Sequence, residues 1–109
     1  MQRMGMVIGV KPEILGEYKR PHAVVWPDVL AQIAENNICN YTIFLREPEN
    51  LLFGYREYHG TDFEGDTARM AQDPRTQEWW TFTNPCQNPL PSRAEGEKWA
   101  PMIEVFHTD

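Results

Sequence analysis

Residues 38–58, ICNYTIFLREPENLLFGYREY, contain two runs rich in apolar and aromatic side chains with four turn-forming residues between them. Both runs, Ile38–Arg46 and Leu51–Tyr58, have the length and composition of β-strands. In the first run Tyr41, Ile43 and Leu45 would share one face. The intervening residues 47–50, EPEN, place Pro and Asn where tight turns favour them. A link this short predicts that the two strands pair as an antiparallel hairpin.

The residues on either side of this hairpin predict two further strands. Met4–Val10 predicts a first strand, with apolar residues on one face and two glycines on the other, where another backbone could approach closely. Pro101–His107 predicts a last strand. Helical spacing and capping residues predict helices over Glu13–Arg20, Pro27–Asn36 and Phe63–Ala71, and a further helical segment from Asp73 through Phe82.

The resulting order, β-α-β-β-α-β, is that of the α+β ferredoxin-like fold, a split βαβ sandwich with a four-stranded antiparallel sheet and helices on one face. The first three strands are apolar or aromatic on both faces, although helices can cover only one of them. A second copy, packed face to face, would cover the other. We therefore expect a homodimer in the form of a dimeric α/β barrel.

Length and composition fit one domain spanning residues 1–109, with 41% hydrophobic and 24% charged residues. No apolar run approaches the roughly 18–20 residues that span a bilayer, and no signal-peptide pattern opens the chain. We expect a cytoplasmic protein without a membrane partner. The net charge of −6 argues against a nucleic-acid partner. Cys39 and Cys86 are expected to be reduced thiols, with a disulfide between them as the alternative.

The segment EYKRPHAVVWP, residues 17–27, places Tyr18, His22 and Trp26 four residues apart. On a helix this spacing puts all three along one stripe. Two prolines interrupt the segment, so a kinked helix or two short helices are expected. The stripe is either a set of packed core aromatics or one wall of a functional site.

The sequence contains no recognisable metal-ligand spacing, phosphate-binding glycine loop or nucleophile elbow, and we expect neither a metal nor a cofactor. Indole faces suit sugar C–H groups, and phenol and imidazole groups reach hydroxyls. A cleft for a small polyol could therefore be lined by Tyr18, His22, Tyr41, Trp79 and Trp80.

Several of these residues also have a purely structural interpretation. Trp79 and Trp80 would point about 100° apart on a helix, so one of them can belong to the core. Tyr41 can be a core or interface residue. His59, in a turn, is expected to be solvated, and His107 to be a surface or interface group.

Five segments of the chain resemble the L-rhamnose mutarotase family, and together they span nearly the whole sequence. They are EYKRPHAVVWP (17–27), NYTIFL (40–45), NLLF (50–53), EWW (78–80) and EVFH (104–107). The resemblance implies a cofactor-free enzyme, a dimeric ferredoxin-like barrel, that interconverts the α and β anomers of L-rhamnose. It implies His22 as proton donor, with Tyr18, Tyr41, Trp79 and Trp80 as sugar contacts.

The proline-rich stretch from Thr83 to Pro101 departs from the family pattern at NPCQNPLP, residues 84–91. L-fucose or another deoxy sugar therefore stays open as the substrate. A stretch of this length is expected to form a lid, an arm or an interface segment. Two other functions also stay open. One is a different cofactor-free dimeric α/β-barrel activity, such as a monooxygenase or lyase, and the other is a non-catalytic sugar-binding module.

Overall fold

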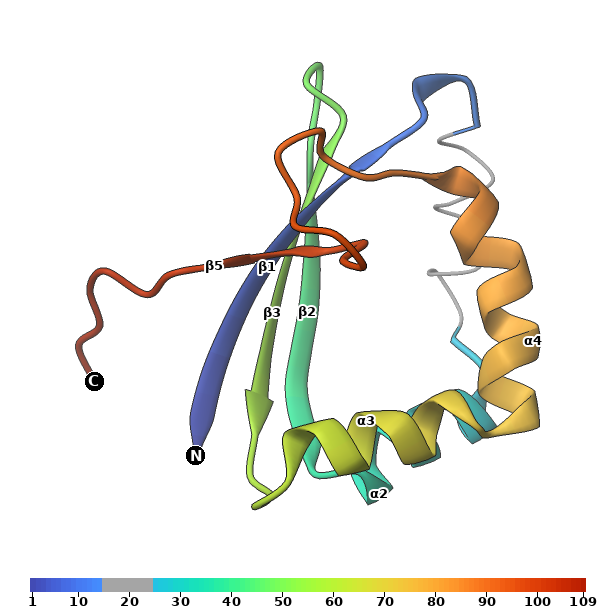
Figure 1. Ribbon diagram of the computed structural model, residues 1–109, viewed down its shortest axis with the longest axis vertical. Coiled ribbons are helices and arrows are strands. Elements are labelled where there is room, and N and C mark those ends of the chain that lie inside the picture. The colour runs from blue at the N-terminus through green and yellow to red at the C-terminus, as the bar shows by residue number, and fades with distance from the viewer. Residues whose placement is uncertain (15–24) are drawn as a thin grey trace.

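The computed structural model of the protein describes residues 1–14 and 25–109. Its centre is an antiparallel sheet of five strands in the order β2-β3-β1-β4, with β5 also pairing with β1 (Figure 1). The long strands are β1 (Gln2–Val10), β2 (Ile38–Arg46) and β3 (Leu51–Tyr58), and the short ones are β4 (Gln87–Asn88) and β5 (Ala100–Met102). The predicted hairpin and α+β ferredoxin-like class are confirmed.

Two short strands, instead of one long one, fill the fourth position of the sheet. Both pair with β1, β4 at Gly9 and Val10 and β5 at residues 5–7. A Cβ atom at Gly9 would collide with the carbonyl oxygen of Asn88, so glycine is what lets β4 approach.

The prediction of a last strand over Pro101–His107 is wrong in its extent, because β5 ends at Met102. Arg3 holds Glu104 by a 2.9 Å ion pair, but the apolar residues around Glu104 have nothing to pack on among the described residues. Ile103, Val105 and Phe106 are 88%, 92% and 79% exposed.

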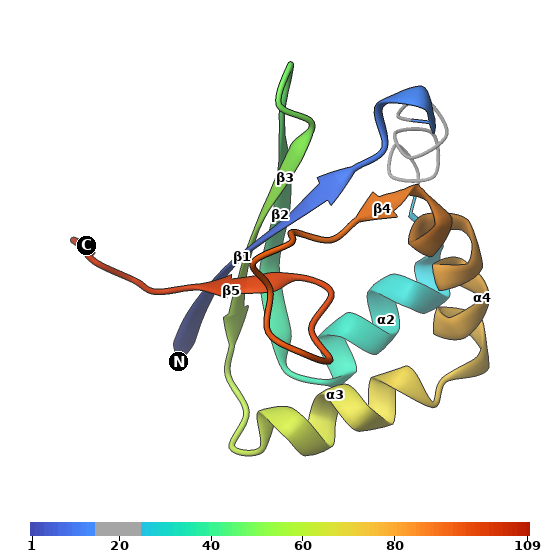
Figure 2. The same ribbon diagram turned by 45° about the horizontal axis from the view of Figure 1, so that its top comes forward.

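The helices lie on one side of the sheet (Figure 2). They are the 3-10 turns η1 (Pro12–Ile14) and η2 (Asn84–Cys86) and the α-helices α2 (Pro27–Glu35), α3 (Phe63–Ala71) and α4 (Pro74–Thr83). The helix predicted over Glu13–Arg20 falls mostly outside the described residues. None of the helices in the described part of the chain is long and apolar enough to cross a membrane.

Local sequence explains where these helices begin and end. Asp62 and Asp73 cap α3 and α4, accepting hydrogen bonds from Gly65 N at 3.1 Å and Thr76 N at 2.8 Å. Pro27 and Pro74 occupy first-turn positions, where no backbone N–H is needed. Asn37, just after α2, has the left-handed φ of 67° that often ends a helix.

A β-bulge interrupts the pairing of β2 with β3. Cys39 pairs with Glu57 and Thr42 with Tyr55, so two residues of β2 stand opposite the single residue between them on β3. The extra residue reverses the alternation of faces. Ile38 therefore lies on the same face as Ile43, whereas strict alternation would place the two residues on opposite faces.

The core forms between the helix-side face of the sheet and the segments that cross it. Ile8, Val10 and Leu52 pack with Cys86 of η2, and all four are at most 2% exposed. Ile43, Leu45 and Trp99 pack against this cluster. Trp99 belongs to the proline-rich stretch, so that stretch contributes directly to the core.

The opposite face of the sheet, the outer face, carries a row of apolar side chains. Val7, Phe53 and Phe44 are adjacent in the register of β1, β3 and β2. Phe44 is 62% exposed, and Val7 and Phe53 are only half-buried. The sequence-based expectation of an apolar outer face is confirmed.

Asp66 ties α3 to the end of β3. Its carboxylate accepts hydrogen bonds from the Tyr58 hydroxyl at 2.5 Å and from Asn37 Nδ2 at 2.9 Å, and it pairs with Arg69. These partners, Tyr58 foremost, hold the pKa of Asp66 below its ordinary value.

Truncation of a core leucine should destabilise the protein strongly. We expect Leu52→Ala to lower the free energy of unfolding by about 2–5 kcal/mol, since it removes apolar contacts and leaves a cavity. The measurement is urea denaturation followed by circular dichroism. Leu30→Ala is the matched control, because Leu30 is 51% exposed on α2 and should change stability by no more than about 0.5 kcal/mol. Equal effects of the two variants would contradict this core.

Acid should weaken the interactions of Asp66 that join α3 to β3. Because the pKa of Asp66 is lower in the folded than in the unfolded state, its stabilisation is complete above the unfolded pKa and is lost as pH falls through the folded one. We expect Asp66→Asn to have a lower Tm than wild type at neutral pH and a smaller further loss between about pH 6 and pH 3. Asp28→Asn, at an exposed carboxylate, is the control. Parallel Tm profiles for wild type and Asp66→Asn would refute the role.

Candidate functional site

Tyr41 and Arg56 lie side by side on the helix-side face of the sheet. The bulge places Tyr41, with Asn40, opposite Arg56. The guanidinium carbon of Arg56 lies 5.9 Å from the centre of the Tyr41 ring and 5.0 Å from that of Phe63, the first residue of α3. The cation thus lies within cation–π distance of two aromatic rings, which is a favourable arrangement.

Arg56 has an unused donor. Its Nε is buried and has no hydrogen-bond partner among the described residues. A buried donor left unpaired costs free energy, which a bound acceptor would recover. This position, beside Tyr41, is therefore suited to an oxygen-rich ligand.

Sequence reasoning did not single out Arg56. The signal was available in the alternation of β3, where Gly54, Arg56 and Tyr58 share one face. Tyr58 is buried there, so a charged residue between such neighbours is unusual and indicates a polar function on the core side.

The phenol of Tyr41 keeps its proton at neutral pH. Its burial raises the pKa above the ordinary value, and the nearby charge of Arg56 only partly opposes this. Tyr41 can therefore donate and accept hydrogen bonds to a ligand, but it is a poor general base.

A second aromatic group joins α4 to the start of α2. Trp79 is buried, with its ring centre 5.2 Å from that of Trp26 in an edge-on arrangement. Trp26 also contacts Phe82 edge-on at 5.7 Å and carries the Arg75 guanidinium 3.9 Å above its ring. The expectation that one of the two adjacent tryptophans belongs to the core holds for Trp79. Trp80 is half-buried and is the more accessible of the pair.

The predicted site residues thus divide into three sets. Tyr41 lies on the sheet with Arg56, and the two tryptophans, Trp79 and Trp80, lie on α4 on the same side of the sheet (Figure 2). Tyr18 and His22 lie outside the described residues.

An open polar hollow of about 320 Å³ lies between α2 and the α3–α4 region. Its lining is Gln32, Glu35, Asn36, Arg69, Gln72 and Asp73, none of which was predicted to bind a ligand. The walls offer no aromatic face, which makes this hollow a poorer sugar site than the surface around Tyr41.

Comparisons with known proteins agree with one another. A sequence model described as L-rhamnose mutarotase matches residues 3–108. A protein of Oceanobacillus iheyensis named L-rhamnose mutarotase is 32% identical over 109 residues, covering all of both chains.

Solved structures resemble the fold. The crystal structure of an L-rhamnose mutarotase from Formosa agariphila superposes with a TM-score of 0.78 at 22% identity, covering all of both chains. Tetracenomycin F2 cyclase from Streptomyces glaucescens, a polyketide cyclase, gives a TM-score of 0.70 at 15% identity, also over all of both chains. At these identities the structural likeness establishes the fold alone.

Proposed function

The chain belongs to the L-rhamnose mutarotase family, and we propose that it is an isomerase that interconverts the α and β anomers of L-rhamnose. The observation that carries the proposal is the family match over residues 3–108, together with relatives of that name at full length. L-fucose or another deoxy sugar is the alternative substrate, because residues 84–91 differ from the family pattern.

The chemistry needs only proton transfers between oxygen atoms. The ring oxygen gains a proton, the anomeric hydroxyl loses one, and the bond between the anomeric carbon and the ring oxygen breaks. The open aldehyde rotates about C1–C2 and closes on the other face. An imidazole, whose pKa is ordinarily near neutrality, suits both proton donation and acceptance, and we assign the donor role to His22.

The described residues fit the remaining tasks of sugar binding and orientation. Tyr41, protonated at neutral pH, can bond a sugar hydroxyl. The Nε of Arg56, which has no partner among the described residues, can donate to a second sugar oxygen. Trp80 offers a partly exposed indole for a sugar C–H face. We assign Tyr18 and Trp79 to the same pocket on the strength of the family resemblance.

Removal of the imidazole should slow anomer exchange more than it weakens binding. We expect His22→Ala to lower the rate constant for exchange of L-rhamnose anomers by about 10²–10⁴-fold, the usual contribution of one acid–base group. The measurement is exchange NMR of the anomeric protons, repeated with L-fucose to compare the two sugars. Trp80→Ala should instead mainly raise the sugar Kd.

His107→Ala is the matched control, since His107 pairs with Asp109 in the exposed tail. A folded His22→Ala variant with full exchange activity would remove His22 from the mechanism. Sugar binding by the wild type without faster exchange would favour a non-catalytic sugar-binding module.

We also propose that the outer face of the sheet forms a homodimer. The row of Val7, Phe53 and Phe44 and the exposed tail residues Ile103, Val105 and Phe106 offer the kind of apolar surface that marks an association site. A second copy would cover both, giving the expected dimeric α/β barrel. The thiol of Cys39 fits the reducing cytoplasm, which we propose as the location.

A charge on the outer face should dissociate this dimer. We expect Phe44→Asp to weaken self-association by at least about 100-fold, because an unpaired charge buried in an interface costs several kcal/mol. Sedimentation velocity over a concentration series measures it. Leu30→Asp, on the exposed side of α2, should stay dimeric. A wild-type protein that is monomeric throughout the series would overturn the proposal.

A further inference from the structure

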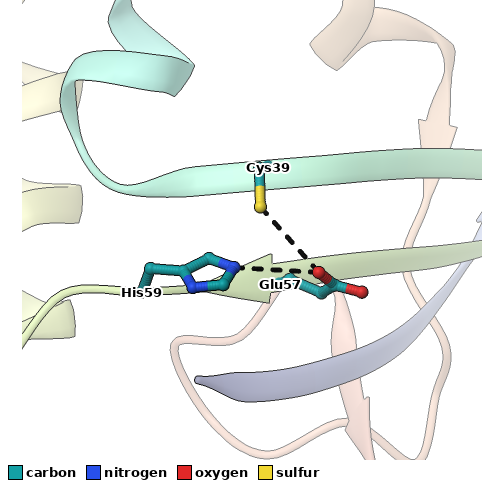
Figure 3. A group of neighbouring side chains, drawn as sticks. All are labelled: Cys39, Glu57 and His59. Atoms are coloured by element: carbon teal, nitrogen blue, oxygen red, sulfur yellow. Dashed lines mark hydrogen bonds and ion pairs between the residues drawn. The ribbon is translucent and has the colours of Figure 1, made fainter. Parts of the chain in front are cut away.

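Cys39, Glu57 and His59 gather at one end of the outer face (Figure 3). Cys39 on β2 pairs in register with Glu57 on β3, and His59 follows two residues after Glu57. One ligand atom from each, a sulfur, an oxygen and a nitrogen, lies within 4.8 Å of the other two. Sequence spacing concealed the group because Cys39 comes from the neighbouring strand.

The carboxylate of Glu57 is oriented from both sides. Its Oε1 accepts a hydrogen bond from Asn40 Nδ2 at 2.8 Å, and its Oε2 accepts one from the Tyr55 hydroxyl at 2.7 Å. These two bonds fix the orientation of the carboxylate. Oε1 also faces Cys39 Sγ at 3.9 Å and His59 Nε2 at 3.7 Å.

The bulge gives this group its geometry. Asn40 has a left-handed φ of 50°, rare for a residue other than glycine, and its side chain reaches Glu57 from there. Hydrogen-bonding partners that fix a ligand carboxylate are typical of protein metal sites.

We propose that Cys39 Sγ, Glu57 Oε1 and His59 Nε2 bind a divalent cation of the zinc type, with water as the fourth ligand. Thiolate, imidazole and carboxylate are the ligands that Zn²⁺ takes in proteins. Tetrahedral coordination brings such ligand atoms to about 3.5 Å from one another. In the structure these atoms lie within 4.8 Å of one another. Small side-chain rotations, which the exposed His59 allows, would shorten the distances to that value.

A positive charge near the group is already paired with a carboxylate. Arg3 lies opposite Glu57 on β1, but it is paired with Glu104 at 2.9 Å. The ion would displace the thiol proton of Cys39, and the protein would release that proton to solvent on binding.

A reactive cysteine is the competing explanation, and the geometry disfavours it. In an activated cysteine the thiol faces the imidazole that removes its proton. Here the contacts of Cys39 Sγ, at 3.9 Å, and of His59 Nε2, at 3.7 Å, both go to Glu57 Oε1 (Figure 3).

The metal group lies apart from the proposed sugar site. Arg56 and Glu57 are consecutive on β3, so they face opposite sides of the sheet. The metal-binding proposal is therefore independent of the proposed mutarotase activity.

The test is titration of chelator-treated, reduced full-length protein with Co²⁺, whose complexes report their ligands by absorption. We expect the protein to bind one Co²⁺ ion per chain and Zn²⁺ to displace it. The bound Co²⁺ should give a near-ultraviolet band from thiolate-to-cobalt charge transfer, and visible absorption bands as strong as those of tetrahedral Co²⁺ complexes. Cys39→Ser should abolish the charge-transfer band. Glu57→Gln and His59→Asn should each raise the Kd for Co²⁺ at least tenfold.

His107→Asn is the matched control and should bind Co²⁺ as wild type does, because His107 lies in the exposed tail. Cys86 is buried in the core, so it leaves Cys39 as the accessible thiol. A wild type without the charge-transfer band, or a Cys39→Ser variant that keeps it, would overturn the proposal. Glu57→Gln and His59→Asn variants that bind Co²⁺ as tightly as wild type would also overturn the proposal.

Discussion

The alternation of side chains along a β-strand is the constraint on which this molecule depends. Neighbouring residues of β3 face opposite sides, so Arg56 enters the aromatic surroundings beneath the helices while Glu57 faces outward. One strand thereby supplies polar groups to two separate regions. The sheet separates these two regions, one on its helix side and one on its outer face.

The bulge in β2 adjusts this alternation where it matters most. By doubling the residues opposite Arg56, it sends Tyr41 to the helix side and Asn40 to the outer side. It also lets Ile38 and Ile43 share the buried face. A strand without the extra residue could not satisfy both requirements, because a one-residue shift turns every side chain over.

Local patterns predicted most of the fold. The bounds of β2, β3 and α3 follow from alternation, turn residues and the Asp62 cap, all of which are encoded within a few residues. The last strand was overestimated because its apolar alternation continues past Met102, where pairing stops. The sequence pattern could not reveal that β1 shares its edge between β4 and β5.

The candidate site was predictable only in part. Residue types and the family resemblance predict Tyr41 and the tryptophans of α4 as sugar contacts. The proximity of Arg56 to Tyr41 and of Cys39 to Glu57 depends on the register of β2 against β3, which the sequence of either strand alone does not determine. The positions of Tyr18 and His22 lie outside the described residues.

The irregularity at Asn40 has a consequence for behaviour at high concentration. β2 is the last strand of the sheet on its side, and a nine-residue edge rich in aromatic and branched residues invites strands of other molecules to add on. A residue in the left-handed region breaks that edge into two short pieces, neither of which offers a long straight template. The kink that sends Tyr41 and Asn40 to opposite faces of the sheet therefore also protects the chain against aggregation.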